Sequence, residues 1–170
     1  PESSRNKISK LSRGVNKAIF FKRKVSKEKV LRKYNIQKNE KILFFCGRVH
    51  ELKGAVLLSE VHNILRKNNV KVVSILAGEN IHGERCLKEG DNKIRLIGHV
   101  KESQVAELYN ICDLFVFPSI YETGPQVILE ARACGAVCIV SKEGGGKRIK
   151  KNGEDGVILN NQSPENWSGK

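Results

Sequence analysis

The chain has 170 residues and a mass of 19.0 kDa, which suits one domain and excludes two full-sized domains with separate cores. Hydrophobic residues make up 39% and charged residues 29%, and no apolar run reaches the roughly 18 to 20 residues of a membrane-spanning helix, which excludes such a span. The net charge is +13 and uneven: residues 1–41 hold 14 Lys and Arg against three Glu, whereas residues 42–170 hold 17 against 15.

Short apolar runs alternate with amphipathic stretches from residue 41 onward, and each apolar run predicts a strand. The predicted strands are 41–46, 71–77, 93–97, 113–117, 136–140 and 156–159. The predicted helices between them are 52–67, 103–110 and 125–134. Strands that are apolar throughout and alternate with helices indicate a parallel sheet covered on both faces. We therefore predict an α/β fold with a doubly wound, mainly parallel sheet, as in Rossmann-like domains.

Residues 1–40 form a basic segment of different character, with one helix expected at 27–34 and Ser26 as its N-cap. The chain opens on Pro1 and contains no Met, and residues 163–165 predict the start of another helix that is cut off. We therefore expect a piece of a longer protein, in which 1–40 leads in from a missing N-terminal domain. Residues 41–170 would be one domain that is truncated at its C-terminus.

The charge of the basic segment has two explanations. Its only rings are Phe20, Phe21 and Tyr34, which disfavours a surface that stacks single-stranded nucleic acid. A solvated linker or helix face needs no partner at all. Attraction to an anionic membrane surface or an acidic acceptor is the alternative.

The five cysteines are an odd number and show no CxxC spacing. Cys46, Cys112 and Cys138 lie in or beside apolar runs, where a free thiol behaves as a small hydrophobe. This favours free thiols in a reducing compartment over zinc ligands or disulfides, so we expect a cytoplasmic protein.

The loops after the predicted strands are where a doubly wound sheet binds ligands. Neither G-x-G-x-x-G after the first strand nor G-x-x-x-x-G-K-[ST] occurs, which argues against hydride transfer and ATP hydrolysis. The first strand is followed by Gly47, which permits a sharp turn, and by Arg48 and Lys53, whose charges would suit a diphosphate. In so basic a chain, the same two cations can equally be solvated surface residues.

Two carboxylates, Glu122 and Glu130, follow the fourth strand with seven residues between them. If a helix starts near Pro125, the free N–H groups of Gln126 and Val127 form an anion site, and Glu130 lies ~6 to 8 Å further along. A sugar hydroxyl, a diphosphate and a ribose could then be bound in that order. Alternatively, Glu122 is only a favourable charge near a helix N-terminus and Glu130 an exposed helix residue.

These motifs follow one another in an order that resembles a known family. The order is GRxxxxKG at 47–54, Gly78, Gly98-His99-Val100, CDLFVFPS at 112–119, Glu-x7-Glu, and Gly144-Gly145. It resembles the C-terminal, donor-binding domain of group 1, family 4 glycosyltransferases of GT-B fold. The stretch SRGVNKAIF at 12–20 is similar to the family's "pNGVDxxxF", and the resemblance spans about residues 11–167.

The resemblance implies a retaining transferase that moves a hexose, such as mannose or glucose, from a GDP- or UDP-hexose to a glycan or glycolipid, in cell-surface polysaccharide or lipopolysaccharide synthesis. It implies no cofactor and no metal ion. The missing N-terminal domain would bind the acceptor, so the fragment alone would be inactive. The enzyme would be cytoplasmic, in peripheral contact with the anionic inner face of the membrane, and would not bind nucleic acid.

The resemblance also assigns roles to residues. Glu122 matches the catalytic glutamate that binds hydroxyls of the donor sugar, Glu130 the one that binds ribose, and Arg48 and Lys53 the diphosphate pair. The other donor-binding positions are Gly47, Val100 near the nucleobase, Thr123, Gly124, Pro125, Gln126 and Val127.

Two positions depart from the family's pattern. Pro125 stands where many relatives have Gly, which removes one N–H donor, and Arg148 stands where the Gly-Gly loop often leads to Glu. The four histidines offer no match to a functional His of the N-terminal domain, and we expect each to be a surface or loop residue. They are His50, His62, His82 and His99.

Two other functions stay open. A nucleoside-diphosphate-sugar epimerase would share the architecture, although GRxxxxKG with Glu-x7-Glu argues against it. A nucleic-acid-binding module would rely on residues 1–40, and its affinity would fall steeply with salt through counterion release. Specific UDP or GDP binding would instead require Glu130.

Overall fold

A parallel sheet organises the chain, of which the computed structural model describes residues 14–89, 92–154, 156–160 and 163–169. The sheet has six strands in the order β3-β2-β1-β4-β5-β6, and every neighbouring pair is parallel. The strands are β1 Lys41–Cys46, β2 Val72–Ala77, β3 Ile94–Gly98, β4 Leu114–Phe117, β5 Cys138–Ser141 and β6 Val157–Leu159. The predicted doubly wound sheet is therefore confirmed, and its order reverses between β1 and β4, where such sheets bind ligands.

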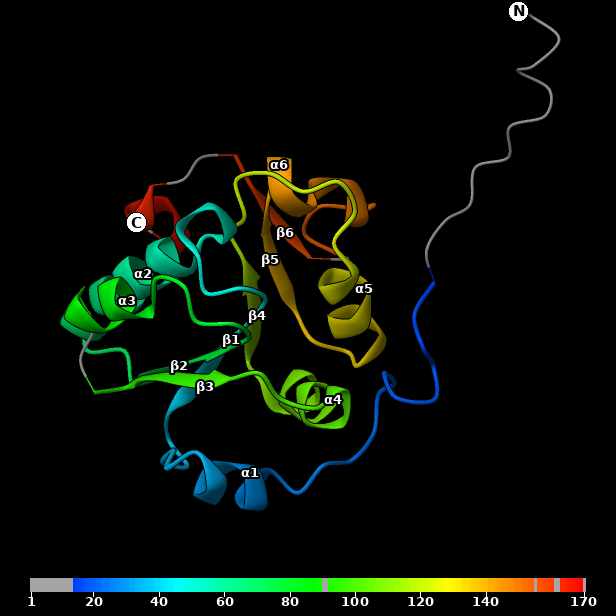
Figure 1. Cartoon of the computed structure of the whole chain (residues 1–170), viewed down its shortest axis with the longest axis horizontal. Coiled ribbons are helices and arrows are strands. Elements are labelled where there is room, and N and C mark those ends of the chain that lie inside the picture. Colours follow the sequence, from blue (N-terminus) through cyan, green and yellow to red (C-terminus); the bar gives the residue numbers. More distant parts are fainter. Residues whose placement is uncertain (1–13, 90–91, 155, 161–162, 170) are drawn as a thin grey trace, which may run out of the picture.

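Helices cover both faces of this sheet, with α2, α3 and α7 on one face and α4 and α5 on the other (Figure 1). The helices and 3-10 turns are α1 Lys27–Lys33, η2 Glu51–Lys53, α2 Ala55–Lys67, α3 Gly83–Glu89, α4 Glu102–Ile111, α5 Gln126–Ala133, α6 Lys142–Gly145, η3 Gly146–Arg148 and α7 Pro164–Ser168. The apolar pattern does not predict α3, α6 and η3, because α3 is mostly polar and the other two are short and rich in Gly. None of the helices in the described parts of the chain is long and apolar enough to cross a bilayer.

Gly54 divides the helix predicted over 52–67. Its φ is +79°, and the short turn η2 ends there before α2 begins at Ala55. A side chain at Gly54 would collide with the carbonyl of Pro118, at the end of β4. Only glycine therefore lets the loop after β1 lie against the loop after β4.

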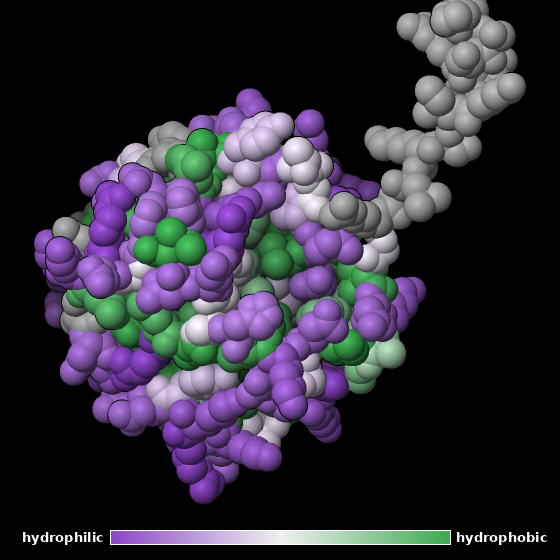
Figure 2. Space-filling model, viewed as in Figure 1, coloured by the Kyte–Doolittle hydropathy of each residue, from purple (hydrophilic) through white to green (hydrophobic). Residues whose placement is uncertain are grey.

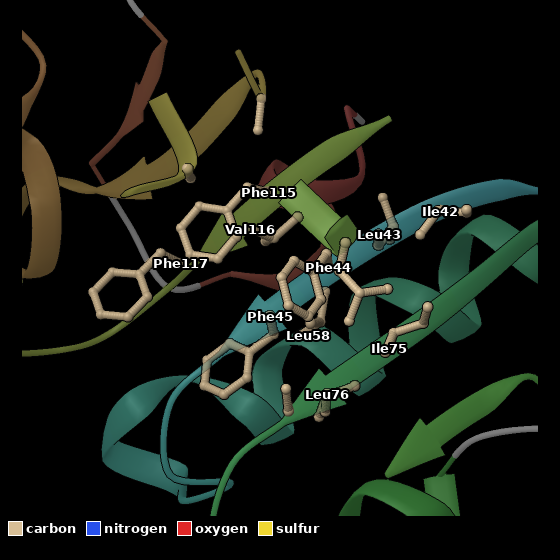
Figure 3. Close-up of a cluster of buried hydrophobic side chains, with 14 of the residues drawn as sticks. Ile42, Leu43, Phe44, Phe45, Leu58, Ile75, Leu76, Phe115, Val116 and Phe117 are labelled. Carbon is tan, nitrogen blue, oxygen red and sulfur yellow. The ribbon is translucent and has the colours of Figure 1, made fainter. Parts of the chain in front are cut away.

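The core is built from residues of β1, β2 and β4 that point to both faces of the sheet. Figure 3 shows Phe44 and Phe45 of β1 beside Phe115 and Phe117 of β4, with Leu58 of α2 covering one side. All five of these side chains are at most 2% exposed. This burial explains why the strands are apolar at every position instead of alternating.

The basic segment packs against this core. Phe20 is 3% exposed, and its ring lies 6.2 Å from that of Tyr109 on α4. Helix α1 begins after Ser26, whose hydroxyl accepts a hydrogen bond from Lys29 N at 3.4 Å, and it buries Val30 and Leu31. The predicted helix and its cap are confirmed, while residues 1–13 lie outside the described part of the chain.

One of the histidine predictions is wrong. His62 is fully buried on α2, and its Nδ1 lies 2.9 Å from Ser74 Oγ on β2. It stands one turn after Leu58, on the side of α2 that covers the sheet, and the serine hydroxyl supplies the polar partner that burial requires.

All five cysteines are free thiols, as predicted. Burial raises the pKa of Cys46 to about 11 and that of Cys112 and Cys138 to about 12. These thiols therefore stay protonated at neutral pH and are poor nucleophiles.

Candidate functional site

The candidate site lies where the loops after β1 and β4 meet at the carboxyl ends of the strands. Ile120 N in the second loop donates a hydrogen bond to Leu52 O in the first at 3.0 Å. The loop after β2 approaches as well, because a side chain at Gly78 would collide with the carbonyl of Gly47. The fold thus brings together predicted site residues that stand nearly 70 positions apart, such as Lys53 and Glu122.

The loop after β1 carries the two predicted cations into different surroundings. Arg48 is exposed and lies beside two pockets, whereas Lys53 is half-buried. Lys53 Nζ forms an ion pair with Glu122 Oε1, and Ser119 Oγ lies 3.4 Å from the same oxygen. The predicted diphosphate cation and the predicted sugar-binding glutamate are therefore paired with each other.

The loop after β2 holds the β1 loop in place. Val49 O accepts a hydrogen bond from His82 N at 2.8 Å, and His82 Nδ1 accepts one from Glu51 N at 3.3 Å. The rings of His50 and His82 stack with centroids 4.3 Å apart, and Arg85 forms an ion pair with Glu51 at 2.5 Å. Sequence reasoning missed this bracing, because no local pattern connects two loops more than 30 residues apart.

Helix α5 begins at Gln126, one residue later than predicted, because Pro125 has extended backbone at φ −65° and ψ 121°. The first-turn N–H groups of Gln126 and Val127 have no acceptor within the helix, as at any helix N-terminus. Gln126 also binds the N-terminal segment, since its Nε2 donates to Gly14 O at 2.9 Å. The helix end predicted to bind anions is therefore present and tied to the rest of the domain.

A first pocket of about 230 Å³ lies in front of this helix end and contains Glu122. Its other wall is the α6–η3 turn, where Gly144 and Gly145 leave no space for side chains against Ser119 and Ile128. The remaining lining residues are Thr123, Gly124, Pro125, Glu143, Lys147 and Arg148. The cations Lys147 and Arg148 were not among the predicted site residues, because the apolar pattern does not predict the turn that presents them.

A second pocket of about 370 Å³ brings Glu130 of α5 together with Gly47, Arg48 and Val100. Val105 of α4 and Phe20 add apolar surface to this second pocket. Arg48 lines the second pocket and a further one that contains Lys53, whose ion pair with Glu122 reaches the first pocket. Gln126 and Val127 line neither the first nor the second pocket.

Glu130 is the half-buried carboxylate of the second pocket, which also contains Glu79 and Glu102. Its side chain is half-buried, and its carboxylate makes no hydrogen bond or ion pair with other residues that the structure describes. Burial, with a smaller contribution from the charge of Glu102, raises the pKa of Glu130. A half-buried carboxylate without a protein partner is a ready acceptor for hydroxyl groups of a ligand.

Comparison with known proteins agrees with the resemblance noted in the sequence. The family described as glycosyl transferases group 1 matches residues 26–170. An uncharacterised glycosyltransferase of Methanocaldococcus jannaschii is 30% identical over 166 residues, covering 94% of this chain and 43% of the relative. A D-inositol 3-phosphate glycosyltransferase of Segniliparus rotundus is 26% identical, covering 95% and 37%. The chain thus spans less than half the length of these relatives.

Solved structures share the fold. The Anabaena protein HepE, in complex with UDP and glucose, has a TM-score of 0.77 at 21% identity, covering 92% of this chain and 44% of that one. The C-terminal domain of a group 1 glycosyl transferase, LpcC of Francisella tularensis, has a TM-score of 0.75 at 21% identity, covering 92% and 85%. Neither an epimerase nor a nucleic-acid-binding module is favoured by these similarities. With its parallel Rossmann-like sheet and the match over residues 26–170, the chain belongs to the group 1 glycosyl transferases of GT-B fold.

Proposed function

We propose that this chain is the donor-binding part of a retaining hexosyltransferase that uses a UDP- or GDP-hexose. The observation that carries the proposal is the placement of Glu122 and Glu130 in separate pockets, one lined by Pro125 just before α5 and the other by Glu130 within α5. A ligand with a sugar at one end, a diphosphate in the middle and a nucleoside at the other end fits this order.

The nucleoside belongs in the second pocket. Glu130 would accept hydrogen bonds from the ribose hydroxyls, which supply the partners that its half-buried carboxylate lacks among the described residues. Val100 and Val105 offer apolar contacts for the base. Nothing in this pocket distinguishes uracil from guanine, so both nucleotides stay in the proposal.

The diphosphate belongs between the two pockets, where the N–H groups of Gln126 and Val127 point outward from the helix. Arg48 stands at the edge of the second pocket and Lys53 at a neighbouring one. Negative charge grows on the diphosphate as it leaves the sugar, and cations placed there in advance stabilise that charge. Lys53 must turn away from Glu122 to take part.

The hexose belongs in the first pocket. Glu122 is the catalytic residue of the proposal, accepting hydrogen bonds from sugar hydroxyls and so orienting the anomeric carbon. The backbone of Thr123 and Gly124 lines the same pocket. HepE, which shares the fold, has been crystallised with UDP and glucose and with UDP-glucose, which supports a nucleotide sugar as the donor class.

The acceptor would be a glycan or glycolipid held by a further domain, since the relatives are more than twice as long as this chain. We place the enzyme in the cytoplasm at the inner face of the membrane, in cell-surface polysaccharide or lipopolysaccharide synthesis. On this proposal the chain alone binds donor without transferring the sugar. The proposal includes no metal ion and no cofactor.

A thermal-shift panel on the 170-residue chain tests the donor class. UDP or GDP and the corresponding hexose conjugate should raise the melting temperature, because a ligand at 100 times its Kd adds roughly 2.7 kcal/mol to stability. NAD and ATP should have no comparable effect. Stabilisation by NAD, or by no nucleoside diphosphate at all, would overturn the proposal.

A further inference from the structure

A cavity of about 560 Å³ between α1 and α4 is lined by four cations of the basic segment. They are Arg23, Lys24, Lys29 and Lys33. The apolar side chains of Val25 and Val30 contribute to the lining, and Glu107 of α4 is the one acid in it. Figure 2 shows hydrophilic side chains over the part of the molecule where α1 lies in Figure 1.

The backbone that carries these cations is held in place. Arg23 N donates a hydrogen bond to Asn110 Oδ1 at 2.8 Å, and Asn110 Nδ2 donates one to Phe21 O at 3.2 Å. Val30 and Leu31 anchor α1 in the core. The cations are therefore attached to a fixed surface.

The positive charge of this cavity exceeds the negative charge of its lining, in which Glu107 is the one acid against four cations. None of the four cations forms an ion pair with another residue that the structure describes. Glu28, which lies within α1, pairs with Lys38 at 3.0 Å, and Glu40 pairs with Lys93 at 2.7 Å. Both acids of the described basic segment thus neutralise charges elsewhere.

The cavity is separate from the donor site, although both use α4. Gln104 and Glu107 face the cavity, whereas Glu102 and Val105 line the second donor pocket. A ligand in the cavity would therefore leave the donor pocket open.

We infer that this cavity and the cations around it bind the headgroups of anionic phospholipids and so dock the protein on a bilayer. Phe21 is 41% exposed next to these cations, with the Arg23 guanidinium 5.2 Å from its ring centroid. An exposed ring flanked by Lys and Arg is typical of segments that lie at a membrane interface. A platform for nucleic acid would need several exposed rings, but Phe20 is buried and Tyr34 is half-buried.

The inference rests on the proposed location at the membrane and not on the proposed donor chemistry. Each Lys or Arg near an anionic surface adds to the attraction, and the contributions accumulate. Four cations around one cavity should therefore matter more than four scattered cations of equal charge.

Sedimentation with vesicles tests this on the 170-residue chain. One variant neutralises the cavity with Arg23→Gln, Lys24→Gln, Lys29→Gln and Lys33→Gln. A control with the same net charge carries Lys67→Gln, Lys71→Gln, Lys88→Gln and Lys150→Gln, all at exposed positions outside the cavity. Vesicles of phosphatidylcholine alone and vesicles containing phosphatidylglycerol are compared, and nucleotide affinity and melting temperature are measured on the same samples.

The unchanged chain should partition onto phosphatidylglycerol vesicles only, and the cavity variant should lose at least about tenfold in partitioning while the control loses much less. Nucleotide affinity should be the same in all three proteins, which separates this inference from the donor proposal. Equal losses in both variants, no binding to anionic vesicles, or a cavity-dependent affinity for RNA in place of vesicles would each overturn it.

Discussion

The two pockets beside α5 differ in how their carboxylates are compensated. Glu122 is paired with Lys53, and Ser119 Oγ lies 3.4 Å from the same carboxylate oxygen. Glu130 has no such partner among the described residues, and burial raises its pKa. The protein therefore neutralises the carboxylate of Glu122 in the first pocket, whereas the carboxylate of Glu130 in the second pocket can gain hydrogen bonds from a ligand.

This difference teaches which glutamate should respond to which part of the donor. A ligand group gains most where it replaces a missing partner, and gains less where it must displace an existing ion pair. The affinity for the free nucleotide should therefore depend on Glu130, whereas Glu122 should contribute to affinity only when a sugar is attached to the nucleotide.

The largest expected effect concerns the cations between the pockets. Arg48→Ala combined with Lys53→Ala should weaken UDP or GDP binding by up to about a hundredfold, on the scale of charged hydrogen bonds. The uncharged nucleoside should lose much less, because it has no phosphates. Calorimetry on both ligands measures the difference.

A control for this prediction neutralises the exposed Lys22 and Lys24, which removes the same charge outside the two donor pockets. Long-range attraction of this kind is screened within about 10 Å at 0.1 M salt, so the loss should be small. An equal loss from both double variants would mean that net charge holds the nucleotide.

The second prediction sharpens the comparison at Glu130. Glu130→Gln keeps the shape of the side chain but removes its charge, and it should weaken UDP or GDP binding by at least about tenfold, the value of a charge-assisted hydrogen bond. Glu107→Gln, on the neighbouring helix α4 but facing away from the donor pocket, is the matched control. Unchanged nucleotide affinity in the Glu130 variant would remove Glu130 from the site.

A third, smaller effect concerns the bracing of the β1 loop. His50 Nδ1 accepts a hydrogen bond from Leu52 N at 3.1 Å and caps η2. His50→Ala should cost about 1 kcal/mol of stability, as for other lost caps, and should weaken UDP binding a few-fold because the loop carries Arg48. His50→Asn should restore most of both losses, since asparagine also caps helices. Failure of this rescue would assign the effect to the stacking on His82.

The smallest effect is on stability. The folded chain binds the Glu130 proton more tightly than the unfolded chain, so ionised Glu130 destabilises the fold above its raised pKa. Glu130→Gln should therefore raise the free energy of unfolding at pH 7 by a few tenths of a kcal/mol, up to about 1. This gain should shrink as the pH falls toward the ordinary glutamate value of about 4.3. Urea unfolding at several pH values would contradict this if the gain were absent at pH 7.

The fold could be predicted well because its strands are buried on both faces. Apolar runs such as 41–46 and 72–77 predict a parallel sheet that is covered on both faces. The ends of the predicted strands agree with the structure to within about two residues. The short helices α3 and α6 were not predicted, because their stability comes from packing of the loops and not from a periodic pattern of apolar residues.

The candidate site could be predicted as a set of positions but not as a set of contacts. The order of motifs pointed to Arg48, Lys53, Glu122 and Glu130, and the structure brings these into adjoining pockets. The ion pair between Lys53 and Glu122 depends on the meeting of two loops nearly 70 residues apart. Such contacts are tertiary, so the spacing of residues along the chain does not predict them.

The difference between the two glutamates is tested most directly by calorimetry with UDP and UDP-glucose, or with GDP and GDP-mannose, on Glu122→Gln and Glu130→Gln. Glu130→Gln should weaken the binding of the free nucleotide and of the nucleotide sugar by the same factor. Glu122→Gln should leave the affinity for the free nucleotide unchanged or raise it slightly, because Lys53 becomes available to the phosphates. It should also abolish any extra affinity that the sugar provides. The reverse pattern, in which Glu122→Gln weakens the free nucleotide and Glu130→Gln affects only the nucleotide sugar, would contradict this assignment of the two pockets.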